Sequence, residues 1–331
     1  MPLINFSSKA GTLKNLERVV KTARIPSMHC LKVSDWNKNK NNCLKGIFEK
    51  FNSNNTLIVR SSSRLEDTAE GSNAGAFLSI QNVDFSILES SVEKVIASFG
   101  KEVSPHDEVL IQPMLENVTR AGVALSHDPN TCSPYRIVNW SEGNDTSSVT
   151  AGLGGQIWQQ AAKSKFIPEK KFSQIISLLE ELLLLFGNVP IDCEFAITNE
   201  KEEKDILWLL QVRRLILSKE PESETTQFNR LKLIEKKVER GMHPHPFLIG
   251  KRTVFGVMPD WNPAEIVGVR PQPLALSLYR ELITDAIWAY QRNNYGYRNL
   301  RSFPLMPNFF GLPYIDVRLS FNSFIPADLN E

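Results

Sequence analysis

The chain has 331 residues, of which 42% are hydrophobic and 23% charged, a composition that suffices for two globular domains. Its 38 lysines and arginines nearly balance 37 aspartates and glutamates, and the net charge of +1 excludes a global field that attracts nucleic acid or an acidic membrane. The four cysteines lack CxxC spacing, and the N-terminus lacks the unbroken apolar stretch of a signal peptide. No apolar run is long enough to span a bilayer. We therefore expect a cytoplasmic protein without nucleic-acid or membrane partners.

The first candidate binding residue is Lys9, in the segment Ser8 to Thr12. This segment leads into leucines and valines at helical spacing, which predicts that a helix starts here. A lysine beside a glycine at the start of a helix is well placed to meet a phosphate group. A solvated surface lysine is the alternative interpretation.

The stretch from Leu57 to Val83 carries the strongest local pattern. A short β-like run ends on Arg60 and is followed by three serines, an acidic turn and the small residues from Gly71 to Gly75. A guanidinium presents a rigid fork of donors to phosphate oxygens, and glycines let backbone N–H groups approach an anion. The pattern therefore predicts a polyanion site, with an ordinary polar loop as the alternative.

Apolar spacing predicts a helix from Ile87 to Phe99 and then two strands. The first strand covers residues 109–115 and the second covers residues 121–126, and we expect the two to pair as a hairpin through a polar turn. Gln112 lies in the first of them and, taken alone, is an ordinary strand residue. His127 follows the second strand and is interpreted as a turn residue. Residues 140–155 form a polar, glycine-rich stretch, and residues 172–186 predict a helix that ends at Gly187.

The second strong pattern runs from Ile191 to Arg214. Asp192 and Glu194 alternate with apolar residues along a predicted strand, so both carboxylates should share one face. A charged turn leads into a second strand that carries Gln211 and Arg213. Carboxylates ligate hard cations and arginine meets phosphate oxygens, so this hairpin suits a bound Mg²⁺–triphosphate. An exposed hairpin with one polar face is the alternative.

Beyond this hairpin the residue composition changes twice along the chain. Residues 216–250 read as a connector that contains a charged helix. The segments PDWNPAE (residues 259–265) and PYIDVR (residues 313–318) flank a predicted helix over residues 274–290. Their aromatic and charged side chains suit either recognition of a small polar acceptor or packing at a domain boundary.

Two of these segments together resemble one known family. VRSSSRLED…AGAFLSIQNV and IDCEFAITNE…LWLLQVR are similar to the signatures VRSS…ED…AG…FLNV and DIE.A…LW.LQ.R of the ATP-binding domain in phosphoenolpyruvate synthase and pyruvate phosphate dikinase. The resemblance covers about residues 5–215. It implies an α+β, two-lobe ATP-grasp domain over residues 1–215, a charged linker over residues 216–250, and the beginning of an incomplete acceptor domain over residues 251–331. The stretch 140–155 departs from the family's usual GLGE..V.G element.

The same resemblance implies the roles of individual residues and the cofactors ATP and Mg²⁺. Arg60 and Arg213 correspond to catalytic arginines, and Glu194, with Asp192, to the metal ligands. The residues implied to contact the nucleotide are Lys9, Arg60, Gln112, Glu194, Gln211 and Arg213.

The implied activity is that of a dikinase-type phosphotransferase. Relatives split ATP to AMP and pass a phosphoryl group through a histidine domain to an acceptor. Residues 251–331 are loosely similar to glutamine kinases of bacterial surface-polysaccharide biosynthesis, which implies a small acceptor such as glutamine. The chain has no glycine-flanked histidine, so a phosphohistidine domain is expected in trans or as a part lost by truncation. The alternatives are a non-catalytic ATP-binding fragment or regulatory subunit, a phosphoenolpyruvate synthase fragment acting on pyruvate, and an ADP-forming kinase.

Overall fold

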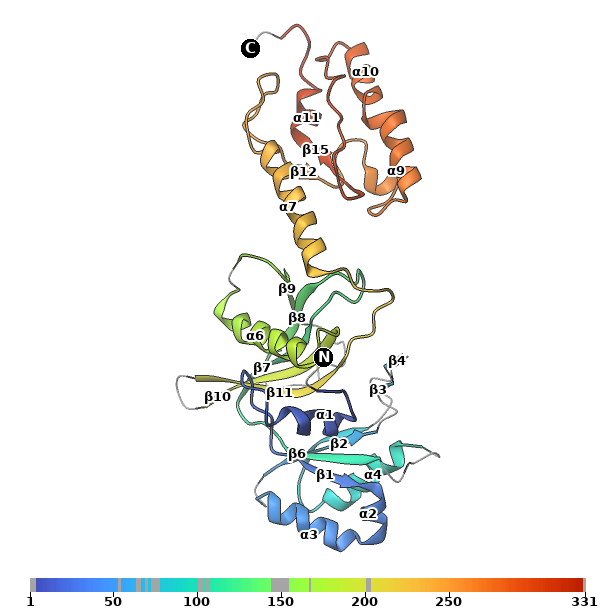
Figure 1. The fold of residues 1–331 in the computed structure, drawn as a ribbon. Helices are drawn as coiled ribbons and strands as arrows, with labels where there is room; N and C mark the ends of the chain where they lie inside the picture. Colours follow the sequence, from blue (N-terminus) through green and yellow to red (C-terminus); the bar gives the residue numbers. More distant parts are fainter. Residues whose placement is uncertain are drawn as a thin grey trace. The chain divides into compact units, whose positions relative to one another are not determined.

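The chain folds into two compact units, Met1–Phe228 and Asn229–Glu331 (Figure 1). The computed structural model describes residues 4–52, 55–63, 67–68, 71–72, 78–100, 104, 107–143, 155–166, 168–200 and 204–329, with the backbone alone at 67–68, 71–72, 200 and 204. Most of the Ser/Gly-rich loop predicted to hold an anion (residues 64–66, 69–70 and 73–77) and the glycine-rich residues 144–154 lie outside this set.

The first sheet of the first unit has four antiparallel strands in the order β1-β6-β2-β5. These strands are β1 (His29–Lys32), β6 (Glu108–Pro113), β2 (Leu57–Ser62) and β5 (Ser79–Val83). Three helices accompany the sheet: α2 (Val33–Lys38), α3 (Lys40–Lys50) and α4 (Leu88–Ser98). Val59 of β2 and Ile111 of β6 are buried in one core with Val92 of α4. Because side chains alternate along a strand, Arg60 projects from the opposite face of the sheet.

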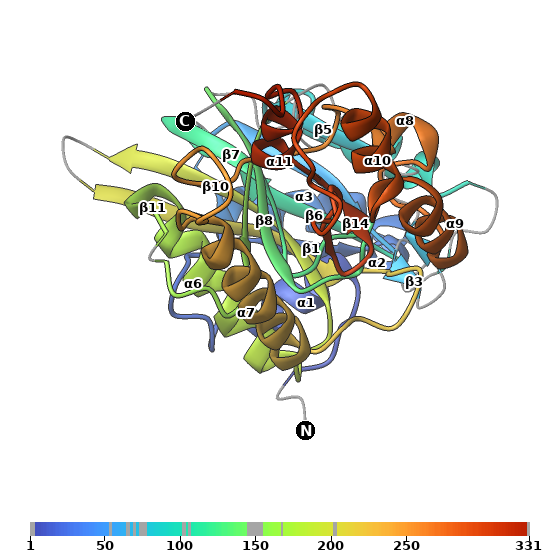
Figure 2. The same cartoon turned by 90° about the horizontal axis from the view of Figure 1, so that it is seen from above.

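The second sheet of this unit has five antiparallel strands in the order β11-β10-β7-β8-β9. They are β7 (Val118–Leu125), β8 (Tyr135–Glu142), β9 (Gln156–Ala161), β10 (Ile191–Glu200) and β11 (Lys204–Arg214). Helix α6 (Lys170–Leu185) packs its leucines against the sheet, and Figures 1 and 2 show it beside these strands. The short helix α1 (Lys9–Leu16) packs on β11. A two-residue pair, β3 (Asp67–Thr68) with β4 (Gly71–Ser72), completes the unit.

Several sequence predictions are confirmed by these elements. The predicted helix over residues 87–99 is α4, and the one over residues 172–186 is α6, after which Gly187 has a φ of 71°. The acidic hairpin is β10–β11. The mixed architecture of helices and antiparallel sheets in two lobes is therefore the one expected.

The predicted hairpin of residues 109–115 with residues 121–126 is wrong. β6 pairs with β1 and β2 in the first sheet, whereas β7 pairs with β10 and β8 in the second. The chain crosses between the sheets after Pro113, and Asn117 adopts a φ of 53°. Both edges of β6 are taken by strands that lie far before it in sequence, whereas β7 pairs with the next strand, β8, and with the distant β10. Local spacing does not reveal this, because two neighbouring apolar runs look alike whether or not they pair.

The predicted helix over residues 274–290 is interrupted. It consists of α9 (Pro273–Tyr279), a π-helical turn (Arg280–Thr284) and α10 (Ile287–Asn294). The N–H of Asp285 donates to the carbonyl of Arg280 at 2.8 Å, and Leu305 N–H donates to the carbonyl of Thr284 at 2.8 Å. A chain segment distant in sequence thus satisfies a carbonyl that the wider turn leaves without an α-helical partner.

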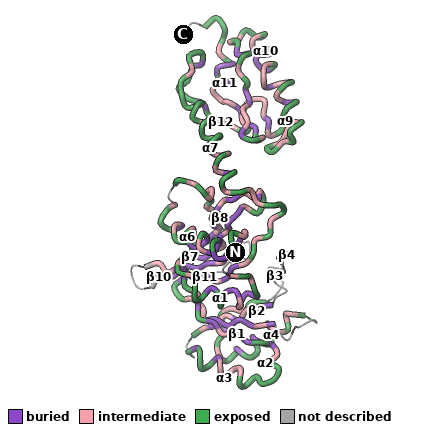
Figure 3. The backbone as a smooth tube through the Cα atoms, viewed as in Figure 1, coloured by how far each residue is buried: buried purple, intermediate pink, exposed green. Residues whose placement is uncertain are grey.

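The second unit is small and has a core around Trp288, Leu305 and Ile315. Its remaining elements are α8 (Pro263–Ile266), α11 (Val317–Asn322), the pair β12 (Phe255–Gly256) with β15 (Ile315–Asp316), and the pair β13 (Asn308–Phe309) with β14 (Leu312–Pro313). Helix α7 (Glu224–Gly241) begins in the first unit and is exposed along most of its length (Figure 3). No helix in the described part of the chain is both long and apolar enough to cross a membrane.

Candidate functional site

Arg60 connects the two sheets of the first unit. Its Nη2 donates to Oε2 of Glu194 and to Oε1 of Gln211, each at 3.1 Å, and its Nη1 donates to the carbonyl of Leu210 at 3.4 Å. Arg60 and Glu194 are 134 positions apart in sequence. The basic segment and the acidic segment that the sequence singled out therefore meet in space.

The hairpin β10–β11 brings four of the predicted residues onto one face. Asp192 lies opposite Arg213 and Glu194 lies opposite Gln211. Cys193 belongs to the core on the other face of the sheet, so the two carboxylates share a face as predicted. The register then shifts, because Phe195 pairs with Leu209 rather than with Leu210. Such a bulge aims a carbonyl or a side chain away from the regular ladder, and here the Leu210 carbonyl accepts from Arg60.

Arg213 is held by Asp192 in a two-pronged ion pair. Nε of Arg213 lies 2.9 Å from both carboxylate oxygens, and its Nη2 lies 2.8 Å from Oδ2. The Asp192 side chain is 9% exposed and that of Arg213 is 25% exposed. A planar guanidinium bound in this way has a fixed orientation, so Arg213 presents a defined edge to the space beside Glu194.

Lys9 is the first residue of α1 and is buried. Ser8 caps the helix by accepting from the N–H of Gly11, and the N–H of Ala10 donates to Oγ of Ser62 at 2.9 Å. This last bond attaches the start of α1 to the end of β2, close to Arg60. The structure therefore brings Lys9 into the same cluster as Arg60 and Glu194.

The cluster is ionised and contains three cations. Burial opposes the ionisation of Glu194, but the charges of Arg60 and Lys9, the hydrogen bond from Arg60 and the charge of Arg213 hold the pKa of Glu194 below its ordinary value. Lys9, Arg60 and Arg213 are three cations against the two carboxylates of Asp192 and Glu194. Three cations gathered in one cluster favour an anionic ligand.

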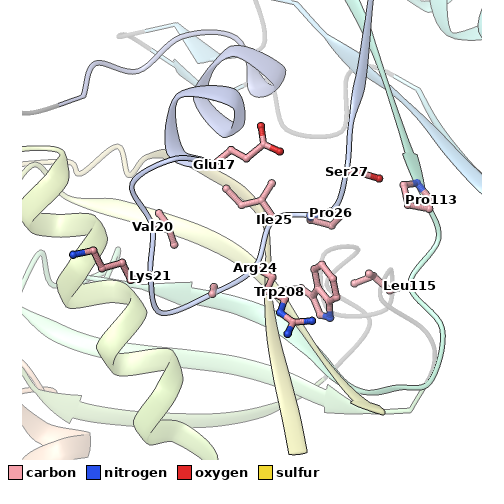
Figure 4. A pocket seen from close by; sticks show the side chains of 11 residues that line it. Glu17, Val20, Lys21, Arg24, Ile25, Pro26, Ser27, Pro113, Leu115 and Trp208 are labelled. Atoms are coloured by element: carbon pink, nitrogen blue, oxygen red, sulfur yellow. The ribbon is translucent and has the colours of Figure 1, made fainter. Parts of the chain in front are cut away.

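Gln112 lies on the same face of the first sheet as Arg60 but makes a different contact. It is opposite Ile58 in the register, is 3% exposed, and donates through Nε2 to the carbonyl of Pro26 at 3.4 Å. Pro26 lines a cleft of about 600 Å³, shown in Figure 4. Its walls are Glu17, Val20, Lys21, Ala23, Arg24, Ile25, Pro26, Ser27, Pro113, Leu115 and Trp208.

The cleft and the charged cluster share strand β11. Trp208 of the cleft wall precedes Gln211 by three residues, which corresponds to roughly 10 Å along a strand. Leu115 belongs to the segment in which the chain crosses from β6 to β7. The charged cluster and a partly apolar cleft thus both involve residues of the same strand.

The residues fit a magnesium site with one protein carboxylate. Among the described residues no group of three or more His, Cys, Asp or Glu side chains is arranged to hold a metal ion. Both oxygens of Asp192 bond to Arg213, whereas in the described part of the chain only Oε2 of Glu194 is in a hydrogen bond. Mg²⁺ is commonly held by one or two carboxylates together with phosphate oxygens and water, so Glu194 suits it. The role of Asp192 as a second ligand stays a prediction.

Sequence reasoning missed the structural use of the serines after Arg60. Ser62 accepts from Ala10, and Ser63 donates to Oδ1 of Asp107 at 2.8 Å. Both serines are buried. These hydroxyls therefore position α1 and the start of the loop. A run of serines after a strand carries no signal that separates this role from anion binding.

The aspartates of the PDWNPAE and PYIDVR segments are hydrogen-bonded to other residues of the second unit. Asp260 accepts from Arg292 at 3.1 Å and from Ser320 at 2.9 Å. Asp316 caps α11 and accepts from Thr253. These contacts account for the aspartates as packing residues, and recognition of an acceptor there stays a prediction.

His127 lies in a buried polar network at the end of β7. Its Nδ1 is 2.9 Å from Oγ of Ser126, and Arg136 nearby bonds to Glu180 and Glu224 at 2.6 Å each and to the Ser126 carbonyl at 2.9 Å. Burial, followed by the charge of Arg136, lowers the pKa of His127 from 6.5 to about 4, against the opposing charge of Glu224. His127 is thus neutral at neutral pH and is packed in the interior.

Stability of the first unit should fall as the solution is acidified from about pH 7.5 to about pH 5, by about 2 kcal/mol attributable to His127. The unfolded chain binds a proton as pH falls through 6.5, whereas the folded protein stays neutral at this residue until about pH 4. The contribution is therefore complete above the unfolded pKa and is lost below it. Urea unfolding at the two pH values measures it. The variant His127→Gln should lose this difference, whereas the exposed-site control His243→Gln should retain it.

No family model matches the chain, and no curated protein matches it. Solved structures similar to it include D-alanine-D-alanine ligase from Helicobacter pylori, with 14% identity over 63% of this chain and 54% of that chain and a TM-score of 0.35. PH1788 from Pyrococcus horikoshii shows 15% identity over 64% and 90%, with a TM-score of 0.36. The biotin carboxylase domain of the Hydrogenobacter thermophilus 2-oxoglutarate carboxylase, solved with MgADP, shows 11% identity over 64% and 40%, with a TM-score of 0.35.

The chain spans about half the length of the D-alanine-D-alanine ligase and of the D-alanyl-alanine synthetase A from Vibrio cholerae, 54% of each. All of these TM-scores lie below 0.5, so the case for a function rests on the residues of the chain itself.

Proposed function

We propose that the first unit binds Mg²⁺–ATP between its two sheets, as an ATP-grasp domain does. The observation that carries this proposal is the meeting of Arg60 and Glu194 at 3.1 Å, beside Lys9 and the Arg213–Asp192 pair. Three cations in a largely shielded cluster favour an anionic ligand with several oxygens. A triphosphate with its metal ion would supply such negative charge and oxygen ligands.

In this arrangement the phosphates contact Lys9, Arg60 and Arg213. These cations neutralise the charge that develops on the phosphoryl oxygens during transfer, and such fixed charges in a partly dry site are the main source of catalysis in phosphoryl transfer. Glu194 would hold the metal ion, which would supply positive charge to neutralise the phosphate oxygens. Asp192 keeps the Arg213 guanidinium in place. We assign no general base.

The nucleobase and ribose are proposed to extend toward the cleft of Figure 4. Trp208, Pro26 and Leu115 give it a partly apolar wall of the kind that holds planar rings. The spacing of roughly 10 Å along β11 between Trp208 and Gln211 suits a nucleotide whose phosphates lie at Arg60. Gln112, bonded to Pro26, supports the wall between the two regions.

Binding of Mg²⁺–ATP, measured by isothermal titration calorimetry, tests the proposal. Arg213→Gln should weaken binding at least about 30-fold, since it removes a charge-assisted contact worth about 2 kcal/mol. The matched control is Arg120→Gln, because Arg120 also lies in the second sheet and binds an aspartate, Asp205, at 2.8 Å. This variant should change the affinity less than about twofold. Equal effects of both substitutions, or no binding by the unaltered protein, would remove the assignment. Arg213→Lys serves if Arg213→Gln does not fold.

We further propose that the chain is the ATP-activating part of a dikinase-type phosphotransferase, with a small polar acceptor such as glutamine. The support is the resemblance of its two motifs to the phosphoenolpyruvate synthase and pyruvate phosphate dikinase family. In that chemistry ATP and water yield AMP, inorganic phosphate and a phosphorylated histidine, which then passes its phosphoryl group to the acceptor.

Product analysis after incubation with ATP, Mg²⁺, a separate phosphohistidine domain and candidate acceptors distinguishes the possibilities. AMP formation that requires the histidine domain supports the proposal. ADP formation would instead indicate direct transfer to an acceptor. Nucleotide binding without turnover would indicate a regulatory module.

A further inference from the structure

Resting on the proposed Mg²⁺–ATP site, we infer that Arg60 is a gate for the metal ion. In the ligand-free protein Arg60 covers the metal-binding carboxylate of Glu194, and the phosphates of an incoming nucleotide draw it away. Metal and nucleotide are thereby coupled, and the protein disfavours metal without nucleotide.

The contacts of Arg60 place it against one carboxylate oxygen of Glu194 and the amide oxygen of Gln211, both of which could ligate a cation. One nitrogen, Nη2, binds both Oε2 of Glu194 and Oε1 of Gln211 at 3.1 Å. The Arg60 side chain is 12% exposed and that of Glu194 is 23% exposed, so both are largely shielded from water. A hydrated divalent cation that takes Oε2 of Glu194 has to displace the guanidinium and overcome its positive charge.

Arg60 is incompletely bonded in this position. Its Nε is buried and, among the described residues, has no hydrogen-bond acceptor. A buried donor without a partner raises the free energy of the state that contains it. In the position over Glu194, therefore, only some of the N–H donors of the Arg60 guanidinium have acceptors among the described residues. A phosphate group offers several acceptor oxygens in the geometry that matches the Nε–Nη edge of arginine, and this difference favours movement toward phosphate.

The other arginine of the hairpin site, Arg213, is bonded differently from Arg60. Its Nε and Nη2 both bind Asp192, within a single hairpin. Arg60, by contrast, reaches from the first sheet to the second. Among the residues that the structure describes, Nη1 of Arg60 makes only a long contact of 3.4 Å to the Leu210 carbonyl. Its movement breaks contacts between sheets and leaves each sheet's own pairing intact.

Binding of Mn²⁺ without nucleotide, measured by electron paramagnetic resonance, tests the gate with the metal ion alone as the probe. Arg60→Gln should bind Mn²⁺ roughly 5- to 50-fold more tightly than the unaltered protein, the range of a typical coupling between two sites. The control Arg213→Gln removes an equal charge near Glu194 without uncovering it, and should gain clearly less. The double variant Arg60→Gln/Glu194→Gln should lose the gain, which locates the metal at Glu194.

An unchanged Mn²⁺ affinity in Arg60→Gln would overturn the gate, as would an equal gain in Arg213→Gln. If Arg60→Gln does not fold, Arg60→Lys replaces it, because a lysine keeps the charge but cannot span the three acceptors, and a gain there supports the gate. Calorimetry of the unaltered protein with Mg²⁺–ATP separates the two hypotheses. ATP binding with no gain in the variants refutes the gate alone, whereas absence of ATP binding refutes the proposed function and the gate with it.

Discussion

Replacing Gly122 with alanine should destabilise the first unit by at least about 3 kcal/mol, because a Cβ at this position has no space. It would lie 2.1 Å from the Asn139 carbonyl oxygen and 2.8 Å from Cα of Trp140. Both atoms belong to the backbone of β8, which pairs with β7 in the middle of the second sheet. Backbone in a central strand cannot move aside without disturbing the pairing with β10 and β9, so the strain is not relieved locally.

Chemical denaturation followed by circular dichroism measures this effect. The control is Gly46→Ala in α3, where the added Cβ meets its nearest atom, Cε1 of His29, at 3.6 Å, an ordinary contact. Alanine is favoured over glycine inside a helix, so this variant should be unchanged or more stable by up to about 1 kcal/mol. A Gly122→Ala protein as stable as the unaltered chain would show that β7 and β8 are not paired in this register.

Glu194→Gln should remove the metal dependence of ATP binding and weaken binding of Mg²⁺–ATP about 100-fold. The substitution keeps the shape of the side chain but deletes the charged ligand. It also leaves the cations Lys9, Arg60 and Arg213 less neutralised, so binding of metal-free ATP should be unchanged or tighter. Asp192→Asn should act differently, since Asp192 bonds to Arg213 through both oxygens. It should weaken ATP binding about tenfold both with Mg²⁺ and without it.

Calorimetric titration with ATP, in excess Mg²⁺ and in a metal chelator, gives both affinities for each variant. Loss of the metal dependence in Asp192→Asn as well would show that Asp192 is a second ligand, as the sequence predicted. Retention of the full metal dependence in Glu194→Gln would contradict the assignment of Glu194. The exposed ion pair Lys45–Glu49 in α3 supplies a control, because Glu49→Gln should leave both affinities unchanged.

The juxtaposition of Arg60 with Glu194 was expected because their two segments together resemble the signatures of one family, since no local rule joins residues 134 positions apart. Strand alternation fixes which face each side chain takes, and the same rule groups Asp192 with Glu194 and Gln211 with Arg213. Which sheet each strand joins is a different matter. β6 pairs with β1 and β2 and β7 pairs with β10, all distant in sequence, and for this reason the expected hairpin between β6 and β7 was wrong.

Other parts of the site were out of reach for similar reasons. The bond from Ala10 to Ser62 and that from Gln112 to Pro26 join segments 52 and 86 positions apart, and no periodic pattern encodes them. The bulge at Leu210 shifts the phase of β11 by one residue, which the apolar run leaves unmarked. The π-helical turn at Arg280–Thr284 likewise depends on a contact from Leu305.

The buried network around Arg136 has a practical consequence for dissecting the molecule. Arg136 is 2% exposed and is neutralised by Glu180 on α6 and Glu224 at the start of α7. Cys132 contacts Ser218 in the intervening segment, and Gln227 is also buried. A fragment that stops at residue 215 would lose Glu224, one of the two counter-ions of Arg136. It would also expose the surface that residues 216–228 cover. Expression of the first unit by itself should therefore retain the chain through Phe228.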